Sequence, residues 1–100
     1  MKLREIYQLV IELGKQADPR GESEVYAALA DARREFESLP PKEQTYFDQE
    51  TLSNPYSDTR ILNGQGDEEI SRLLTGIDME LGEVLLAQEL SKSGQPIDLI

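Results

Sequence analysis

Five side chains are candidates to line a binding pocket, and each has a simpler structural interpretation. Asp78, Met79 and Glu80 follow an apolar run, and Asn54 and Asp58 lie in a cluster of turn-forming residues. In the simpler interpretation Asp78 caps a helix, Glu80 complements its dipole, and the Asn54 cluster is a turn. None of the five is predicted to be a catalytic, cofactor-binding or metal-binding residue.

The absence of two residue types restricts the chemistry of this protein. It contains neither His nor Cys, which excludes Ser-His and Cys-His catalytic pairs and also imidazole or thiolate metal ligands. Chemistry would have to rely on carboxylates, Lys, Tyr or backbone groups. We therefore expect no enzymatic activity and no cofactor within these residues.

The charge balance excludes some partners. Ten basic and twenty acidic residues give a net charge of −10. Nucleic acids and anionic membranes both require clustered Lys and Arg, so neither is an expected partner. The N-terminal residues are not expected to be a signal peptide, and no apolar run approaches the length of a membrane span. The sequence predicts a cytoplasmic protein.

Residues 1–53 are predicted to form a helical N-terminal extension. One helix is expected from about residue 2 to 17 and a second from about 22 to 39, separated by Asp18-Pro19-Arg20-Gly21. The apolar stripe of the first helix repeats at three and four residues and consists of Leu3, Ile6, Val10, Leu13 and Ala17. The second helix has an apolar stripe of its own, which consists of Val25, Ala28, Leu29, Ala32 and Phe36. Two such stripes joined by a short turn favour an antiparallel helical hairpin.

Residues 54–100 are predicted to begin an α/β core, with a short strand at about 59–62. The segment 68–93 fits one long helix by spacing, but Gly76 and Gly82 each disfavour it by about 1 kcal/mol. The division that we prefer has a strand at about 70–77, Asp78 as N-cap, a helix at about 79–93, and a strand from 97. It predicts an incomplete βαβ unit with parallel strands. The fold class is therefore α/β.

Three segments resemble one protein family. They are Asn54-Pro55-Tyr56-Ser57-Asp58-Thr59-Arg60-Ile61-Leu62 with Gly64, the run from Gly76 to Ala87, and Ile97-Asp98-Leu99-Ile100. In order and spacing they resemble the Nif-three-like (NGG-interacting-factor-three) proteins, type-two GTP cyclohydrolase I homologues. The resemblance implies a helical extension before an α/β core, toroidal hexamers, and suspected metal-dependent hydrolysis. In that family the strand beginning at Ile97 continues into a paired-His motif, which binds a divalent metal pair together with later Asp, His and Glu residues.

This sequence differs from the family pattern because it ends before the paired His, so no metal ligand can be assigned to it. The chain ends inside an apolar strand, and we expect it to be the front portion of a larger protein. Its partners would be the remainder of its own polypeptide and further copies of itself. Asp78 and Glu80 would then follow a parallel strand, where ligands of open sheets bind. The alternative function is a stand-alone acidic, mostly helical protein-interaction module.

Overall fold

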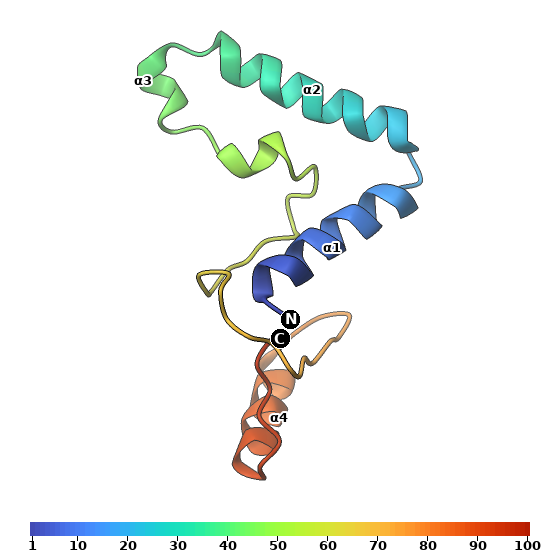
Figure 1. The fold of residues 1–100 in the computed structure, drawn as a ribbon, viewed down its shortest axis with the longest axis vertical. Coiled ribbons are helices and arrows are strands. Elements are labelled where there is room, and N and C mark those ends of the chain that lie inside the picture. Colours follow the sequence, from blue (N-terminus) through green and yellow to red (C-terminus); the bar gives the residue numbers. More distant parts are fainter. The chain divides into compact units, whose positions relative to one another are not determined.

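The computed structural model describes all 100 residues, and 52% of them are helical, whereas 4% lie in β-bridges. The helices are α1 (Leu3–Ala17), α2 (Glu22–Ser38), α3 (Pro41–Gln44), the 3₁₀ helix η1 (Gln49–Leu52) and α4 (Leu81–Lys92), as Figure 1 shows. None of these helices combines the length and apolar character that a bilayer span requires.

The protein divides into two compact units. The helical unit is Tyr7–Leu62, and the bridged unit consists of Met1–Ile6 with Asn63–Ile100. This division differs from the expected boundary near residue 53. Residues 54–62 belong to the helical unit because Asn54 bonds to Tyr7 of α1 and Arg60 bonds to Glu50 of η1.

In the helical unit, local signals set the ends of α2. Gly21, with φ +87°, precedes the helix, and Glu22 and Glu24 place negative charge at its first turn. At the other end, Leu39 is extended because it precedes a proline. The side chain of Val25 is completely buried.

The prediction that α1 and α2 form an antiparallel hairpin is wrong. Both helices form close to their expected bounds, but they do not pack along their lengths, and α2 packs against η1 instead (Figure 1). At the far end of α2, the rings of Phe36 and Phe47 lie 5.2 Å apart. The apolar face of α2 is therefore covered by the segment that comes after it.

The predicted apolar stripe of α1 is largely exposed. Val10 and Leu13 are 47% and 53% exposed, whereas Ile11, on a different face of the helix, is 5% exposed. Of the predicted stripe only Leu3 is buried. The helix is apolar on two faces, and spacing alone does not tell which one is covered.

In the bridged unit, the loop around Gly66 holds the start of α1. The backbone N–H of Leu3 donates to the Glu68 carbonyl at 2.9 Å, and that of Arg4 donates to the Gly66 carbonyl at 3.0 Å. Lys2 and Glu69 form an antiparallel bridge. These bonds satisfy N–H groups that have no partner within the helix.

The structure has no strand at residues 59–62. A strand requires a neighbouring strand with which to exchange backbone hydrogen bonds. Here the side chain of Arg60 is instead paired with Asp48 and Glu50, so the segment is held by side-chain contacts.

The predicted strands 70–77 and 97 onward are each reduced to one bridged residue. Leu73 and Leu99 form a parallel bridge. The Leu74 N–H donates to the Leu99 carbonyl and the Asp98 N–H donates to the Arg72 carbonyl, each at 2.9 Å. Parallel strands form stable sheets when both faces are covered and further strands flank them. Leu73 is 48% exposed, so this pairing lacks such cover. The regular structure is mostly helical, and the sheet expected of the α/β class is limited to this pairing.

The single long helix over 68–93 does not form, because residues 68–80 are not helical and α4 begins only at Leu81. Helix α4 lies in the sequence between the bridged residues Leu73 and Leu99. Because the helix starts at Leu81, its N-cap is Glu80 and not the expected Asp78. The Glu80 N–H donates to the Glu83 carboxylate at 2.9 Å. The helix ends at Lys92, one residue before the predicted end, and its C-cap is Ser93 rather than the predicted Gly94. Gly94 follows the cap with φ +85°, and the Gln95 N–H donates back to the Leu90 carbonyl at 2.8 Å.

Two glycine substitutions test this description. Gly82 is helical with open space where a Cβ would lie, so Gly82→Ala should stabilise the protein by about 1 kcal/mol. Gly64 has φ +122°, and an added Cβ would lie 2.8 Å from Leu3 Cδ2, so Gly64→Ala should destabilise it by about 2 kcal/mol. Urea unfolding measures both. Shifts of the same sign would contradict the structure.

Candidate functional site

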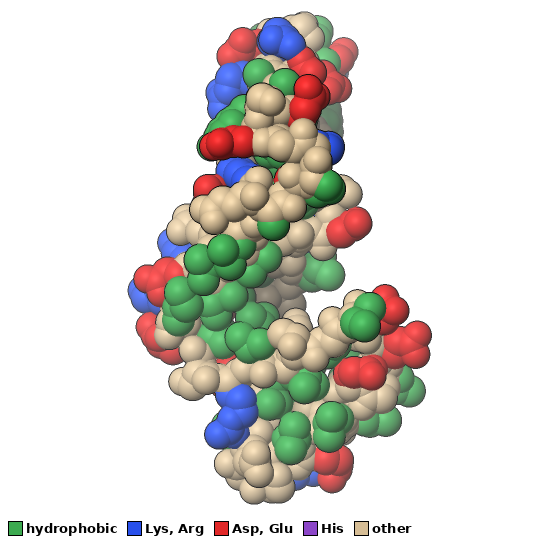
Figure 2. All heavy atoms as spheres, turned by 90° about the vertical axis from the view of Figure 1, so that its right-hand side faces the viewer, with side chains coloured by type: hydrophobic (Ala, Val, Ile, Leu, Met, Phe, Trp, Pro, Cys, Tyr) green, Lys and Arg blue, Asp and Glu red, His purple; other side chains and the backbone are tan.

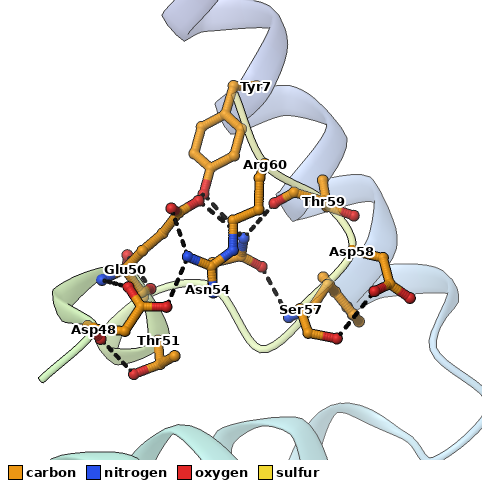
Figure 3. A network of polar contacts seen from close by, with 11 residues as sticks. Tyr7, Asp48, Glu50, Thr51, Asn54, Ser57, Asp58, Thr59 and Arg60 are labelled. Carbon is orange, nitrogen blue, oxygen red and sulfur yellow. Dashed lines mark hydrogen bonds and ion pairs between the residues drawn. The ribbon is translucent and has the colours of Figure 1, made fainter. Parts of the chain in front are cut away.

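A polar network connects α1 with the loop after η1 (Figure 3). The buried amide of Asn54, 2% exposed, lies at its centre. Its Nδ2 is 3.0 Å from Tyr7 Oη and 3.3 Å from Glu50 Oε1. It is also 2.6 Å from the Thr59 carbonyl, and its Oδ1 accepts the Tyr56 N–H at 2.8 Å. We call the side chains of Tyr7, Asp48, Glu50, Asn54 and Arg60 the Asn54 network.

The local sequence explains how these side chains are positioned. The bond from the Tyr56 N–H to the Asn54 side chain spans two residues, as in an Asx turn, and the intervening Pro55 restricts the backbone. Asp48 caps η1 by accepting the Glu50 N–H at 3.1 Å. The cap and the turn together present Glu50 and Asn54 to Tyr7.

Glu50 is the shared acceptor of the network. It accepts a short hydrogen bond from the Tyr7 hydroxyl and one of 2.7 Å from Arg60 Nη1, which also lies 2.8 Å from Asp48 Oδ2. Arg60 Nε is buried without a partner. The single guanidinium is therefore paired with two carboxylates at once.

The hydrogen bonds fix the charge states at neutral pH. The hydrogen bond from Tyr7, with those from Asn54 and Arg60, lowers the pKa of Glu50. Burial, and then the hydrogen bond to Glu50, raises the pKa of Tyr7. Glu50 stays ionised and Tyr7 protonated, so neither is matched to proton transfer at neutral pH. The network is suited to holding the loop on α1.

A second cluster closes the turn between α1 and α2. The carboxylate of Asp18, 5% exposed, accepts hydrogen bonds from Arg20 Nη2 at 2.8 Å and from the Tyr56 hydroxyl at 3.1 Å. The hydrogen bonds from Arg20 hold the pKa of Asp18 well below its usual range. The ring of Tyr56 lies against Gly14, where an added Cβ would be 3.0 Å from its Cε2.

One open hollow lies beside the Asn54 network. Its volume is about 190 Å³, and it is lined by Tyr7, Gln8, Ile11, Glu12, Lys15 and Ser53. Lys15 and Glu12 are paired at 2.8 Å, so the wall carries little net charge. Ligand pockets commonly exceed about 300 Å³, so the hollow is small for a substrate site.

The sequence-predicted residues occupy different surroundings. Asn54 is buried and its hydrogen-bonding atoms are occupied within the helical unit, whereas Asp58 is exposed and accepts only from Ser57 Oγ at 3.3 Å. Asp78, Met79 and Glu80 are exposed in the bridged unit. Their role as pocket residues stays a prediction.

No three or more Asp or Glu side chains are grouped as a metal site would require. Sequence reasoning missed Tyr7, Glu50 and Arg60, since the hydrogen bonds from Tyr7 to Glu50 and from Asn54 to Tyr7 span 43 and 47 residues. No local pattern signals such a pairing.

No family model, curated protein or solved structure matches this sequence. The resemblance to the Nif-three-like proteins therefore depends on the sequence motifs alone.

Removing one hydroxyl tests the Asn54 network. Tyr7→Phe should lower the free energy of unfolding by about 1.5–3 kcal/mol, because a hydrogen bond to a charged acceptor is lost. Tyr46→Phe is the matched control, since Tyr46 is 84% exposed. Equal effects of the two substitutions in urea unfolding would show that the Tyr7 hydroxyl bond does not stabilise the fold.

The pH dependence of stability tests the charge state of Glu50. Its folded pKa lies below the ordinary value of about 4.3, so its contribution is complete above that value and is lost as the pH falls through the folded pKa. The difference in unfolding free energy between the unsubstituted protein and Glu50→Gln should shrink from neutral pH to pH ~3. A difference independent of pH would contradict the lowered pKa.

Proposed function

We propose that this protein is the N-terminal portion of a Nif-three-like protein. In this proposal it supplies the helical extension and the first βαβ unit of the α/β core. The divalent metal pair and the suspected hydrolytic chemistry belong to residues after Ile100. These 100 residues hold no metal ligand and have no activity of their own.

The observation that carries the proposal is the parallel bridge between Leu73 and Leu99. Two parallel neighbours need a crossover connection, and here helix α4 provides it. The Asp98 carboxylate strengthens the pairing by accepting the N–H groups of Ser71 and Arg72, both at 2.9 Å. These bonds lower the pKa of Asp98, which stays ionised at neutral pH. A helix between two parallel segments is the arrangement that the resemblance implies at this point of the sequence.

The exposure of α4 supports a larger core. Leu81 is 71% exposed, and Val84, Leu85 and Leu86 are each about half exposed, while Ala87 on the same helix is buried. Hydrophobic side chains reach the surface in the space-filling view (Figure 2). A helix that is apolar on several faces is typical of a buried position. Further strands and helices of the same sheet would cover these side chains.

The proposal gives Asp78, Met79 and Glu80 a place in the complete protein. They follow the first bridged segment, and ligands of open parallel sheets bind beside the carboxyl ends of strands. In the family the paired His follows the next strand, which here begins at Ile97. The three residues would then line the edge of the metal pocket without binding the metals. The complete protein is proposed to be cytoplasmic and to form homo-oligomers, with no nucleic-acid or membrane partner.

A stand-alone interaction module is the second candidate, and the exposed face of α1 favours it. Leu9, Val10 and Leu13 are 48%, 47% and 53% exposed on one helix of a protein with net charge −10. Such a face suits an amphipathic partner helix with basic flanks. This candidate requires no further sheet.

The coding sequence after the Ile100 codon separates the two functions. The first proposal expects it to continue the strand and then encode a pair of His residues. A stop codon directly after Ile100 would contradict it and favour the module.

Metal titration is the second test. Calorimetry of the 100-residue protein with Zn²⁺ or Mn²⁺ should show no stoichiometric site, whereas the complete protein should bind metal and lose it when both His are replaced by Ala. A stoichiometric site in the 100-residue protein would refute the assignment of the metal ligands to later residues.

A further inference from the structure

The two asparagines of this protein have different C-terminal neighbours. Asn63 precedes Gly64, and Asn54 precedes Pro55. A backbone N–H after an Asn can attack the side-chain amide carbon, and a glycine leaves that approach unhindered because it has no Cβ. Proline has no N–H, so Asn54 cannot react in this way.

The structure leaves Asn63 free to react. Both Asn63 and Gly64 are exposed. The Asn63 side chain and the Gly64 N–H take part in none of the hydrogen bonds that hold the neighbouring loop, where the N–H groups of Gln65 and Gly66 donate to Glu68 at 2.6 and 2.8 Å. Asn54, in contrast, is buried with its amide fully bonded.

We propose that Asn63 is a site of spontaneous deamidation and isoaspartate formation. The Gly64 nitrogen attacks Asn63 Cγ and forms a C–N bond, while the bond between Cγ and Nδ2 breaks. Ammonia leaves, carrying the proton lost from the Gly64 N–H, and a cyclic imide remains. Water then opens the imide at either carbonyl and returns a proton to the nitrogen. Opening at Cγ gives Asp, and opening at the backbone carbonyl gives isoaspartate.

Isoaspartate would alter the loop that holds the start of α1. It inserts one methylene group into the backbone directly before Gly64, whose neighbours Gly66 and Glu68 accept the N–H groups of Arg4 and Leu3. Space is limited there, because even a Cβ on Gly64 would lie 2.8 Å from Leu3 Cδ2. The isoaspartate form should therefore lose the two backbone bonds, whereas the Asp form, with an unaltered backbone, should keep them.

Peptide mapping by mass spectrometry after incubation of the protein in warm neutral buffer tests the proposal. A synthetic peptide of residues 61–67 provides the unfolded reference rate, Asn54 in the same digest is the internal control, and Asn63→Gln is the matched variant. We expect loss of the Asn63 form at a rate similar to that of the synthetic peptide, with both Asp and isoaspartate as products. Asn54 should stay intact, and Asn63→Gln should give no product.

Two results would overturn the proposal. Asn63 could persist in the folded protein after the synthetic peptide has fully converted, which would mean that the fold protects it. Alternatively, Asp could form with no isoaspartate, which would mean direct hydrolysis without an imide. For the structural consequence, amide hydrogen exchange at Leu3 and Arg4 should be faster in the purified isoaspartate form than in Asn63→Asp, and equal exchange would contradict it.

Discussion

The hydrogen bonds of the buried Asn54 amide determine how the helical unit is arranged. Burying an amide without partners costs several kcal/mol (about 2–7, depending on the reference state), so its donors and acceptor must be satisfied together. Tyr7, Glu50 and Thr59 supply the acceptors, and they come from α1, η1 and the loop. This requirement brings the Tyr7 face of α1 against the loop, and Ile11 is buried on the same side.

The exposed stripe of α1 is a consequence of the same arrangement. Once the Tyr7 face is covered, the residues predicted to form the core, Val10 and Leu13 among them, are left at the surface. In the bridged unit the exposed apolar residues of α4 have a different origin, since they flank a single parallel bridge rather than a sheet. The two exposed surfaces therefore support the two candidate functions separately.

Sequence reasoning located the helices because their signals are local. Turn residues after Ala17, the proline after Leu39 and Gly94 after α4 each act within a few residues, and the structure has helix ends at or near all three. The same reasoning failed for the buried face of α1 and for the strand at 59–62. Those features depend on Glu50 and Asn54 bonding to Tyr7, more than forty residues away, and on Arg60 pairing with carboxylates. The pocket roles of Asp78 and Glu80 stay a prediction, because both residues are exposed in the structure.

Thiol labelling measures directly which face of α1 is covered. The protein has no Cys, so a single introduced thiol is the only one that reacts. We predict that the Val10→Cys variant reacts rapidly with a water-soluble thiol reagent and that the Ile11→Cys variant reacts slowly until the protein is unfolded in urea. Rapid reaction of the Ile11→Cys variant in the folded protein, or protection of the Val10→Cys variant, would contradict the arrangement around Asn54.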